Sequence, residues 1–242
     1  MAQEFSPAKI TPPALSGIIS RKRLFRQLDA GRKCPIIWIC GPPGSGKTTL
    51  AASYLKDRNL PCLWYRLDEG DDDAGSFFYY MGLAARKAAP PKLSRNRRQL
   101  PLLSPENLLA LPTFARRYFQ DLYERLKAPS AIVFDNYHDV PAGSLLHKLI
   151  HDGLTETPSG INIIFTSRHA PPPSIADFRS KGMVEIIPWN ALSLTIKEQK
   201  IRWMGGGITP PLNRGGEKEA GSIHHEHRNP GGGLRLPCRR GL

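Results

Sequence analysis

The residues best suited to chemistry lie in one glycine-rich segment, GPPGSGKTT. It fits the pattern G-x-x-x-x-G-K-[ST], in which glycines let consecutive backbone N–H groups converge on phosphate oxygens. The lysine of the pattern reaches the terminal phosphates, and the threonine hydroxyl can bind Mg²⁺. We therefore predict a phosphate-binding site for a nucleotide, formed by Gly41, Pro42, Pro43, Gly44, Ser45, Gly46, Lys47, Thr48 and Thr49.

The flanking residues predict a strand before this segment and a helix after it. An apolar run occupies 36–40, and residues that favour helices occupy 50–55. The positive N-terminal end of that helix would face the phosphates. A chance glycine and proline turn would not require agreement between the motif and both flanks, so we favour phosphate binding.

A second candidate is the acid that ends the apolar run 131–134. Asp135 follows the Walker B pattern, in which a strand carries one carboxylate to the sheet edge where the phosphates bind and where it holds Mg²⁺. The pattern is weak alone and stronger downstream of a phosphate-binding segment. We predict that Thr48 and Asp135 hold the metal ion, and that His138 and Asp139 are loop residues and not metal ligands.

A third candidate follows the apolar run 161–165, where Thr166, Ser167 and Arg168 end the predicted strand. An arginine at that edge can stabilise the negative charge of a γ phosphate. The alternative is a helix cap followed by a surface arginine. Position alone leaves the two interpretations equal.

The remaining patterns predict an α/β domain with a mostly parallel sheet of five strands. Apolar runs predict further strands at 62–67 and 183–187, and a solvated acidic run at 68–73 is expected to cap the next helix, with a metal site as the alternative. A long loop with a helical turn at 106–110 is expected at 90–112. Helices are expected at 21–28, 76–88, 113–127, 143–150 and 175–181.

Composition limits the classes of function. The net charge of +13 could favour a polyanion, but the basic residues are dispersed in short groups and no DNA-reading module is evident. No apolar run approaches the length of a membrane-spanning helix, and residues 1–10 lack the pattern of a signal peptide. We expect a cytoplasmic protein with no membrane partner.

Several blocks together resemble the N-terminal ATPase domain of MalT-like STAND regulators, which are signal-transduction NTPases. The resemblance spans about 15–201 and includes IISRKRLFRQLDAG, GPPGSGKTTLAASYL, LWYRLDEGDDDAGSFFYY, IVFDNYHDV, IIFTSRHAPPP and MVEIIPWNALSLTIKEQ. It implies a three-layer P-loop NTPase sandwich with strand order 5-1-4-3-2. It also implies that ATP or ADP and Mg²⁺ are the cofactors, and that Lys47, Asp135 and Arg168 are the catalytic residues, with Arg168 as the γ-phosphate sensor and 18–23 over the adenine.

Members of this family act as switches in which exchange of ADP for ATP leads to self-association, often in regulators of transcription. Many relatives carry a second acid after the Walker B residue, where this chain has Asn136, an amide that cannot accept a proton as a carboxylate can. We therefore expect at most a slow Mg²⁺-dependent ATPase. The alternatives are a P-loop small-molecule kinase, with Asp139 or an acid near Asp71 as its base, and a non-hydrolysing interaction module that keeps its nucleotide.

The sequence predicts three regions: an extended segment at 1–16, the NTPase domain at 17–204, and a tail at 205–242. The tail holds 10 of the 22 glycines and has no sustained apolar period. Such a composition predicts disorder, because it buries too little apolar surface to offset the entropy of ordering. We interpret the tail as an aberrant or frameshifted end.

Overall fold

The computed structural model describes residues 8–88, 99–196, 198 and 199, so the predicted tail lies outside the described residues. Residues up to Ser193 belong to one compact unit, and the described residues from Leu194 onward belong to a second. Only the first unit carries the candidate site. Its helices are α1 (Lys22–Gly31), α2 (Lys47–Asp57), α3 (Ala74–Ala88), α5 (Leu111–Arg125), α6 (Leu146–Leu154), α7 (Pro173–Ser180) and α8 (Trp189–Leu192).

Five parallel strands form one sheet: β1 (Ile36–Cys40), β2 (Cys62–Arg66), β3 (Ser130–Asp135), β4 (Ile161–Ser167) and β5 (Val184–Ile187). Their order is β2-β3-β4-β1-β5, which confirms the predicted order read from the other edge. Because all strands run the same way, the ends of β1, β3 and β4 meet at one edge of the sheet. That edge holds the segment after Cys40 and the residues around Asp135 and Ser167.

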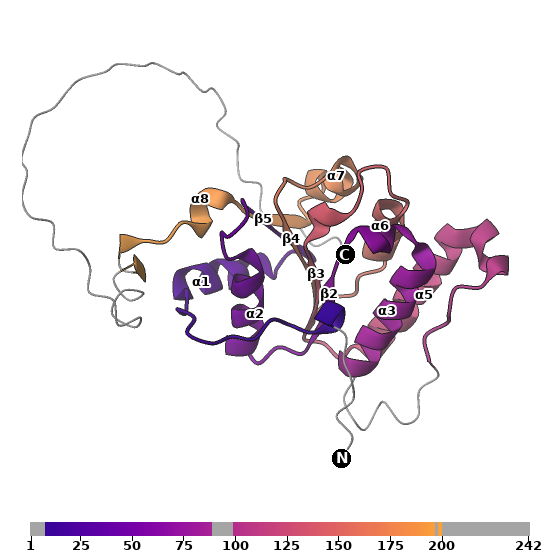
Figure 1. The fold of residues 1–242 in the computed structure, drawn as a ribbon, viewed down its shortest axis with the longest axis horizontal. Helices are drawn as coiled ribbons and strands as arrows, with labels where there is room; N and C mark the ends of the chain where they lie inside the picture. The colour runs from indigo at the N-terminus through magenta and orange to yellow at the C-terminus, as the bar shows by residue number, and fades with distance from the viewer. Residues whose placement is uncertain (1–7, 89–98, 197, 200–242) are drawn as a thin grey trace, which may run out of the picture. The chain divides into compact units, whose positions relative to one another are not determined.

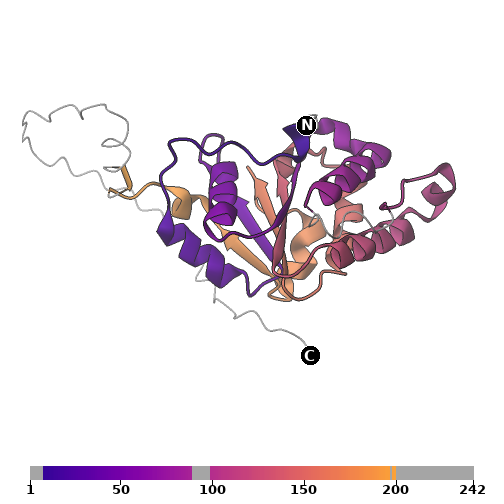
Figure 2. The same cartoon turned by 90° about the horizontal axis from the view of Figure 1, so that it is seen from below.

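Helices cover both faces of the sheet, so the domain has three layers. α1 and α2 lie on one side, and α3, α5 and α6 on the other (Figures 1 and 2). Along β1 the side chains alternate: Ile37 and Ile39 pack under α1 and α2, while Ile36 and Trp38 pack on the opposite face. This alternation explains the continuous apolar run, since a strand covered on both faces needs apolar residues at every position.

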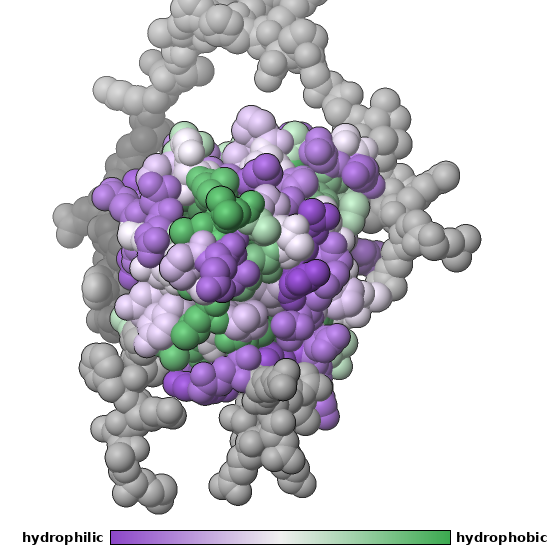
Figure 3. Space-filling view, turned by 90° about the vertical axis from the view of Figure 1, so that its right-hand side faces the viewer, coloured by the Kyte–Doolittle hydropathy of each residue, from purple (hydrophilic) through white to green (hydrophobic). Residues whose placement is uncertain are grey.

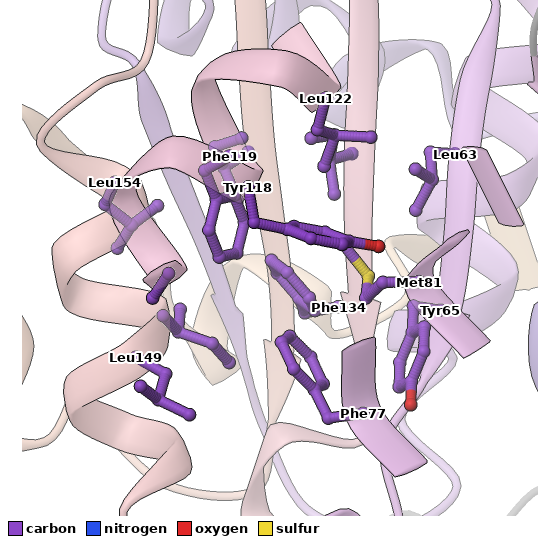
Figure 4. Packing of buried hydrophobic residues seen from close by; sticks show 14 of the residues in the cluster. Leu63, Tyr65, Phe77, Met81, Tyr118, Phe119, Leu122, Phe134, Leu149 and Leu154 are labelled. Atoms are coloured by element: carbon purple, nitrogen blue, oxygen red, sulfur yellow. The ribbon is translucent and has the colours of Figure 1, made fainter. Parts of the chain in front are cut away.

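The larger hydrophobic core lies between the sheet and α3, α5 and α6. Phe77 and Met81 from α3 meet Tyr118 and Leu122 from α5, above Phe134 of β3 (Figure 4). The Tyr118 hydroxyl donates to the carbonyl of Phe78 at 2.9 Å, which satisfies the one polar group that this ring brings into the core. On the face that carries α3 and α5, hydrophilic side chains surround scattered hydrophobic ones (Figure 3).

Four short 3-10 turns join these elements: η1 (Ala8–Ile10), η2 (Glu69–Asp72), η3 (Pro105–Ala110) and η4 (Tyr137–Asp139). η3 lies where a turn was predicted at 106–110, within a loop of which 89–98 lie outside the described residues. η1 lies in the segment predicted to be extended, and its Ile10 is buried. Among the described residues, no helix combines the length and apolar character that crossing a membrane would require.

Some helix boundaries differ from the prediction. α6 begins at Leu146 and not at residue 143, because the Ser144 Oγ accepts the Leu146 N–H at 3.1 Å and so lies before the helix. α5 begins two residues before the expected start, with Pro112 in its first turn, where a missing N–H breaks no helical hydrogen bond. The short helix α8 was not predicted.

The acidic run 68–73 is only partly the solvated cap that we expected. Asp73 accepts the Ser76 N–H at 2.7 Å and caps α3, as predicted. Asp71, however, is fully buried and accepts hydrogen bonds from Tyr65 Oη at 2.6 Å and Asp68 N at 2.9 Å, and Lys9 Nζ lies 2.9 Å from its carboxylate. The metal alternative finds no support, because the described residues contain no group of three potential ligands.

Candidate phosphate site

The predicted phosphate-binding loop connects the end of β1 to the start of α2. Gly44 and Gly46 have φ of 73° and 80°, the left-handed region that favours glycine, and a Cβ on either would meet no atom within 4 Å. Glycine is therefore favoured at these two positions by the backbone conformation, and not by a lack of room for a side chain. Gly46 is also the N-cap of α2, so the first N–H groups of this helix have no side-chain acceptor.

Lys47 lies almost buried at the first position of α2, with 7% of its surface exposed. Its Nζ donates to the carbonyl oxygens of Gly41 at 2.7 Å and Pro42 at 2.9 Å, and to Ser45 Oγ at 3.3 Å. Burial, and next the positive charge of Arg168, lower the pKa of Lys47, while Asp135 acts in the opposite direction. The loop thus surrounds the ammonium with oxygen acceptors at the N-terminus of the helix.

Asp135 lies at the end of β3 and is 3% exposed. One oxygen, Oδ1, accepts hydrogen bonds from Thr48 Oγ1 at 2.8 Å and Thr166 Oγ1 at 2.6 Å. The structure therefore brings together the two residues that we predicted as metal ligands. A carboxylate and a hydroxyl at this distance are oxygen ligands of the kind that Mg²⁺ prefers.

Asn136, directly after the candidate acid, has φ of 62°, and its backbone N–H donates to Thr166 Oγ1 at 3.1 Å. Asparagine tolerates this left-handed conformation better than most residues. The same Thr166 hydroxyl therefore joins the ends of β3 and β4. The sequence had marked 166–168 only as a polar strand end, without assigning this contact to Thr166.

Arg168 follows β4 and is exposed. Its charge lowers the pKa of both Lys47 and His138, so the guanidinium lies near the candidate phosphate site. The sensor role of Arg168 stays a prediction, as do the catalytic roles of Lys47 and Asp135.

The first residue of the loop packs against α8, a contact that sequence reasoning missed. A Cβ on Gly41 would lie 3.0 Å from Leu192 Cδ1 and 3.2 Å from Trp189 Cε3. The α8 segment is held in turn by the start of α1: Arg23 Nη2 donates to the carbonyl of Ala191 at 2.9 Å, and Arg21 Nη2 donates to that of Leu192. Glycine at position 41 allows this close approach.

Comparison with known proteins finds transcriptional regulators among the relatives of this chain. The chain is 28% identical to the HTH-type transcriptional regulator MalT of Vibrio campbellii over 183 residues, which are 74% of this chain and 20% of that protein. It is 25% identical to MalT of Klebsiella pneumoniae over 207 residues, or 85% of this chain and 22% of that protein. The chain thus spans about a fifth of the length of the curated relatives that it matches.

Among solved structures, a Walker-type ATPase of Pyrococcus abyssi aligns with a TM-score of 0.49 and 14% identity, covering 81% of this chain and 61% of that one. A family model described as Nephrocystin 3, N-terminal, matches residues 17–168, more than half of the chain. The match begins just before α1 and ends at Arg168, so it includes the glycine-rich loop, Asp135 and Thr166. The chain therefore belongs to the nephrocystin 3 N-terminal family, and its NTPase domain is MalT-like.

Proposed function

We propose that residues 41–49 bind ATP and ADP together with Mg²⁺, and that the domain, taken as residues 17–204, works as a slow nucleotide-dependent switch. The observation that carries this proposal is the hydrogen bond between Thr48 Oγ1 and Asp135 Oδ1, which joins the glycine-rich loop to the acid of a different strand. The two residues are 87 positions apart, and only this fold brings them together.

The residues present fit a nucleotide with its metal ion. Thr48 and Asp135 supply the hydroxyl and the carboxylate for Mg²⁺, which when bound would neutralise phosphate charge. Lys47 needs only to exchange the carbonyl oxygens of Gly41 and Pro42 for phosphate oxygens, because its ammonium already lies at the mouth of the helix. Arg168 adds a second positive charge on the side of β4.

Slow hydrolysis follows from Asn136, whose amide cannot take a proton from an attacking water. A general base contributes about 10²–10⁴-fold to a rate. We therefore expect Asn136→Asp to raise ATP turnover about tenfold or more above the wild-type rate, measured as phosphate release under steady state. Equal rates for both proteins would show that the amide does not limit hydrolysis.

The regulatory part of the proposal comes from the relatives. The matched relatives are regulators of transcription by name, and this chain corresponds to about a fifth of them. We propose that the domain serves the same kind of regulator in the cytoplasm, where its nucleotide state controls self-association. Light scattering of the full chain with ADP and with a non-hydrolysable ATP analogue tests this, and the same mass in both states would refute it.

For the kinase alternative, fewer residues can serve as the general base than the sequence suggested. Among the acids near Asp71, Asp71 itself is fully buried and bonded to Tyr65 and Lys9, so it cannot reach a substrate, whereas Asp72 is exposed. Asp139 stays accessible, with 34% of its side chain exposed. Steady-state turnover with added small-molecule acceptors would distinguish a kinase, because a switch would not be stimulated by them.

The deciding experiment is calorimetry of Mg²⁺-ATP and Mg²⁺-ADP binding to the wild type and to Lys47→Ala. The matched control is Lys56→Ala, which removes an exposed lysine from the far end of the same helix. We expect Lys47→Ala to abolish measurable binding and Lys56→Ala to leave it unchanged. Binding by Lys47→Ala at the wild-type affinity would refute the site.

A further inference from the structure

A cavity of about 1040 Å³ opens beside the candidate phosphate site, at the same edge of the sheet. It is lined by residues that follow β3 and β4 and by residues from α6 and the start of α7, but by none from the glycine-rich loop 41–49. Its volume is at the upper end of the range for small-molecule sites. The cavity is therefore a separate space and not the phosphate site itself.

His138 is a buried polar side chain at the cavity whose hydrogen bonding is incomplete. Its side chain is 5% exposed and lines the cavity, and neither Nδ1 nor Nε2 forms a hydrogen bond with any described residue. The nearest carboxylate, Asp139, lies 3.3 Å from Nε2. An unsatisfied buried donor or acceptor is unfavourable, so this ring is available to a group that enters the cavity.

Asp152 is a second side chain at the cavity whose hydrogen bonding is incomplete. Its side chain is 18% exposed and lines the cavity, with Oδ1 3.6 Å from His151 Nδ1. The other oxygen, Oδ2, is buried and forms no hydrogen bond to any residue that the structure describes. A carboxylate oxygen only accepts hydrogen bonds, so the missing partner must be a donor.

The lining is acidic although the chain as a whole is basic. The lining carries four carboxylates, those of Glu69, Asp139, Asp152 and Asp177, together with four histidines and one ammonium, that of Lys148, and the charges of Arg168 and Lys47 also act on His138. The chain carries a net charge of +13, so this reversal of sign at one cavity is not a consequence of average composition. Opposite charge near a binding site favours the partner that carries it.

These features argue against a metal ion and favour an organic cation. In the residues that the structure describes, 8–88, 99–196, 198 and 199, no three histidines, cysteines or acids lie together as metal ligands would. The acids instead lie around a large space, and Asp152 Oδ2 and the unprotonated ring nitrogen of His138 can each accept from an N–H donor. An organic ammonium or guanidinium meets both needs, since it carries positive charge and several donors.

We propose that this cavity is a second binding site, specific for a small organic cation, in which Asp139 and Asp152 accept hydrogen bonds from its N–H groups and His138 contacts it from the floor of the cavity. The site does not require a bound nucleotide. Failure of nucleotide binding and failure of this proposal are therefore separate results.

The test uses the full chain and two probes of the same length, 1,4-diaminobutane and 1,4-butanediol, measured by calorimetry without nucleotide. We expect saturable binding of the diamine at one site and none of the diol. Asp139→Asn and Asp152→Asn should each weaken diamine binding about tenfold or more, because each removes a charged acceptor. The control Asp121→Asn removes the same charge from an exposed position on α5 and should leave the affinity unchanged.

Three results would overturn the proposal. The diamine and the diol could bind equally, which would mean that charge is not recognised. Asp121→Asn could weaken binding as much as the cavity variants do, which would indicate a non-specific charge effect. Absence of saturable diamine binding would show that the cavity is filled by solvent alone.

Discussion

Replacing Asp71 by alanine should destabilise the domain more than any other change in the acidic run 68–73. The carboxylate accepts from Tyr65 Oη at 2.6 Å and Asp68 N at 2.9 Å, with Lys9 Nζ 2.9 Å away. Tyr65 and Asp71 are both fully buried, so the hydroxyl cannot turn to water when its acceptor is lost. Lys9 keeps its ion pair with Asp68, at 2.6 Å, and therefore loses only one of its two carboxylate partners.

We work the expected loss from these contacts. Leaving the Tyr65 hydroxyl unsatisfied costs about 1–3 kcal/mol. Breaking a buried charged pair by removing one partner costs about 3–5 kcal/mol. Because Lys9 keeps its contact with Asp68, we take the lower end of both ranges and expect Asp71→Ala to lower the free energy of unfolding by about 4 kcal/mol.

Equilibrium urea unfolding, followed by far-ultraviolet circular dichroism, measures this loss. The matched control is Asp72→Ala, an exposed neighbour whose removal should change the free energy of unfolding by no more than about 0.5 kcal/mol. Adding Tyr65→Phe to Asp71→Ala should recover about 1 kcal/mol, because it removes the unsatisfied hydroxyl. If Asp71→Ala and Asp72→Ala unfold at the same urea concentration, Asp71 is not the structural residue described here.

Three further predictions test the site, the packing and the charges. Asp135→Asn keeps an acceptor for Thr48 but loses the charge, so Mg²⁺ should no longer strengthen nucleotide binding in calorimetry. Gly153→Ala places a Cβ 2.3 Å from the Phe119 ring and should lower stability by about 1–3 kcal/mol in thermal unfolding, whereas Gly143→Ala meets no atom within 4 Å and should not. The hydrogen bond from Arg58 lowers the pKa of Asp29 below 3.8. The small stabilising contribution of the Asp29 carboxylate is therefore present above pH 3.8 and lost as the pH falls through the lowered pKa. Asp29→Asn should remove this pH dependence of stability.

Each of these predictions has a result that contradicts it. An unchanged Mg²⁺ effect in Asp135→Asn would remove this residue from the proposed metal site. Equal melting temperatures for the two glycine variants would mean that α5 and α6 can separate without cost. An Asp29→Asn variant that loses stability in acid as steeply as the wild type would assign that dependence to other carboxylates.

Most of the fold could be predicted because its core strands are continuous apolar runs. The residues of β1 are apolar at every position, and the structure shows why, since Ile37 and Trp38 face different helix layers. Boundaries were less predictable where a side chain decides them, as Ser144 does for α6. α8 was missed because one turn of helix is too short to show a period, and tertiary contacts with Gly41 fix it.

For the candidate site, the sequence predicted which residues gather but not what they contact. Parallel strands require Asp135 to lie near the glycine-rich loop, and the structure places its carboxylate on Thr48. The contact to Thr166 needed the register of β3 on β4, which sequence does not show. The prediction for Asp71 was wrong because an acidic run is typical of a solvent-exposed loop, and its partner Lys9 lies in a proline-rich segment that was predicted to be extended.

The contact between α8 and Gly41 has a mechanical consequence. The chain leaves the first compact unit after Ser193, one residue beyond the end of α8. Leu192 touches the first residue of the phosphate loop, and the carbonyls at the end of α8 accept the guanidinium groups of Arg21 and Arg23. A movement of the phosphate loop would therefore displace this single helical turn, which the guanidinium groups of Arg21 and Arg23 connect to the start of α1.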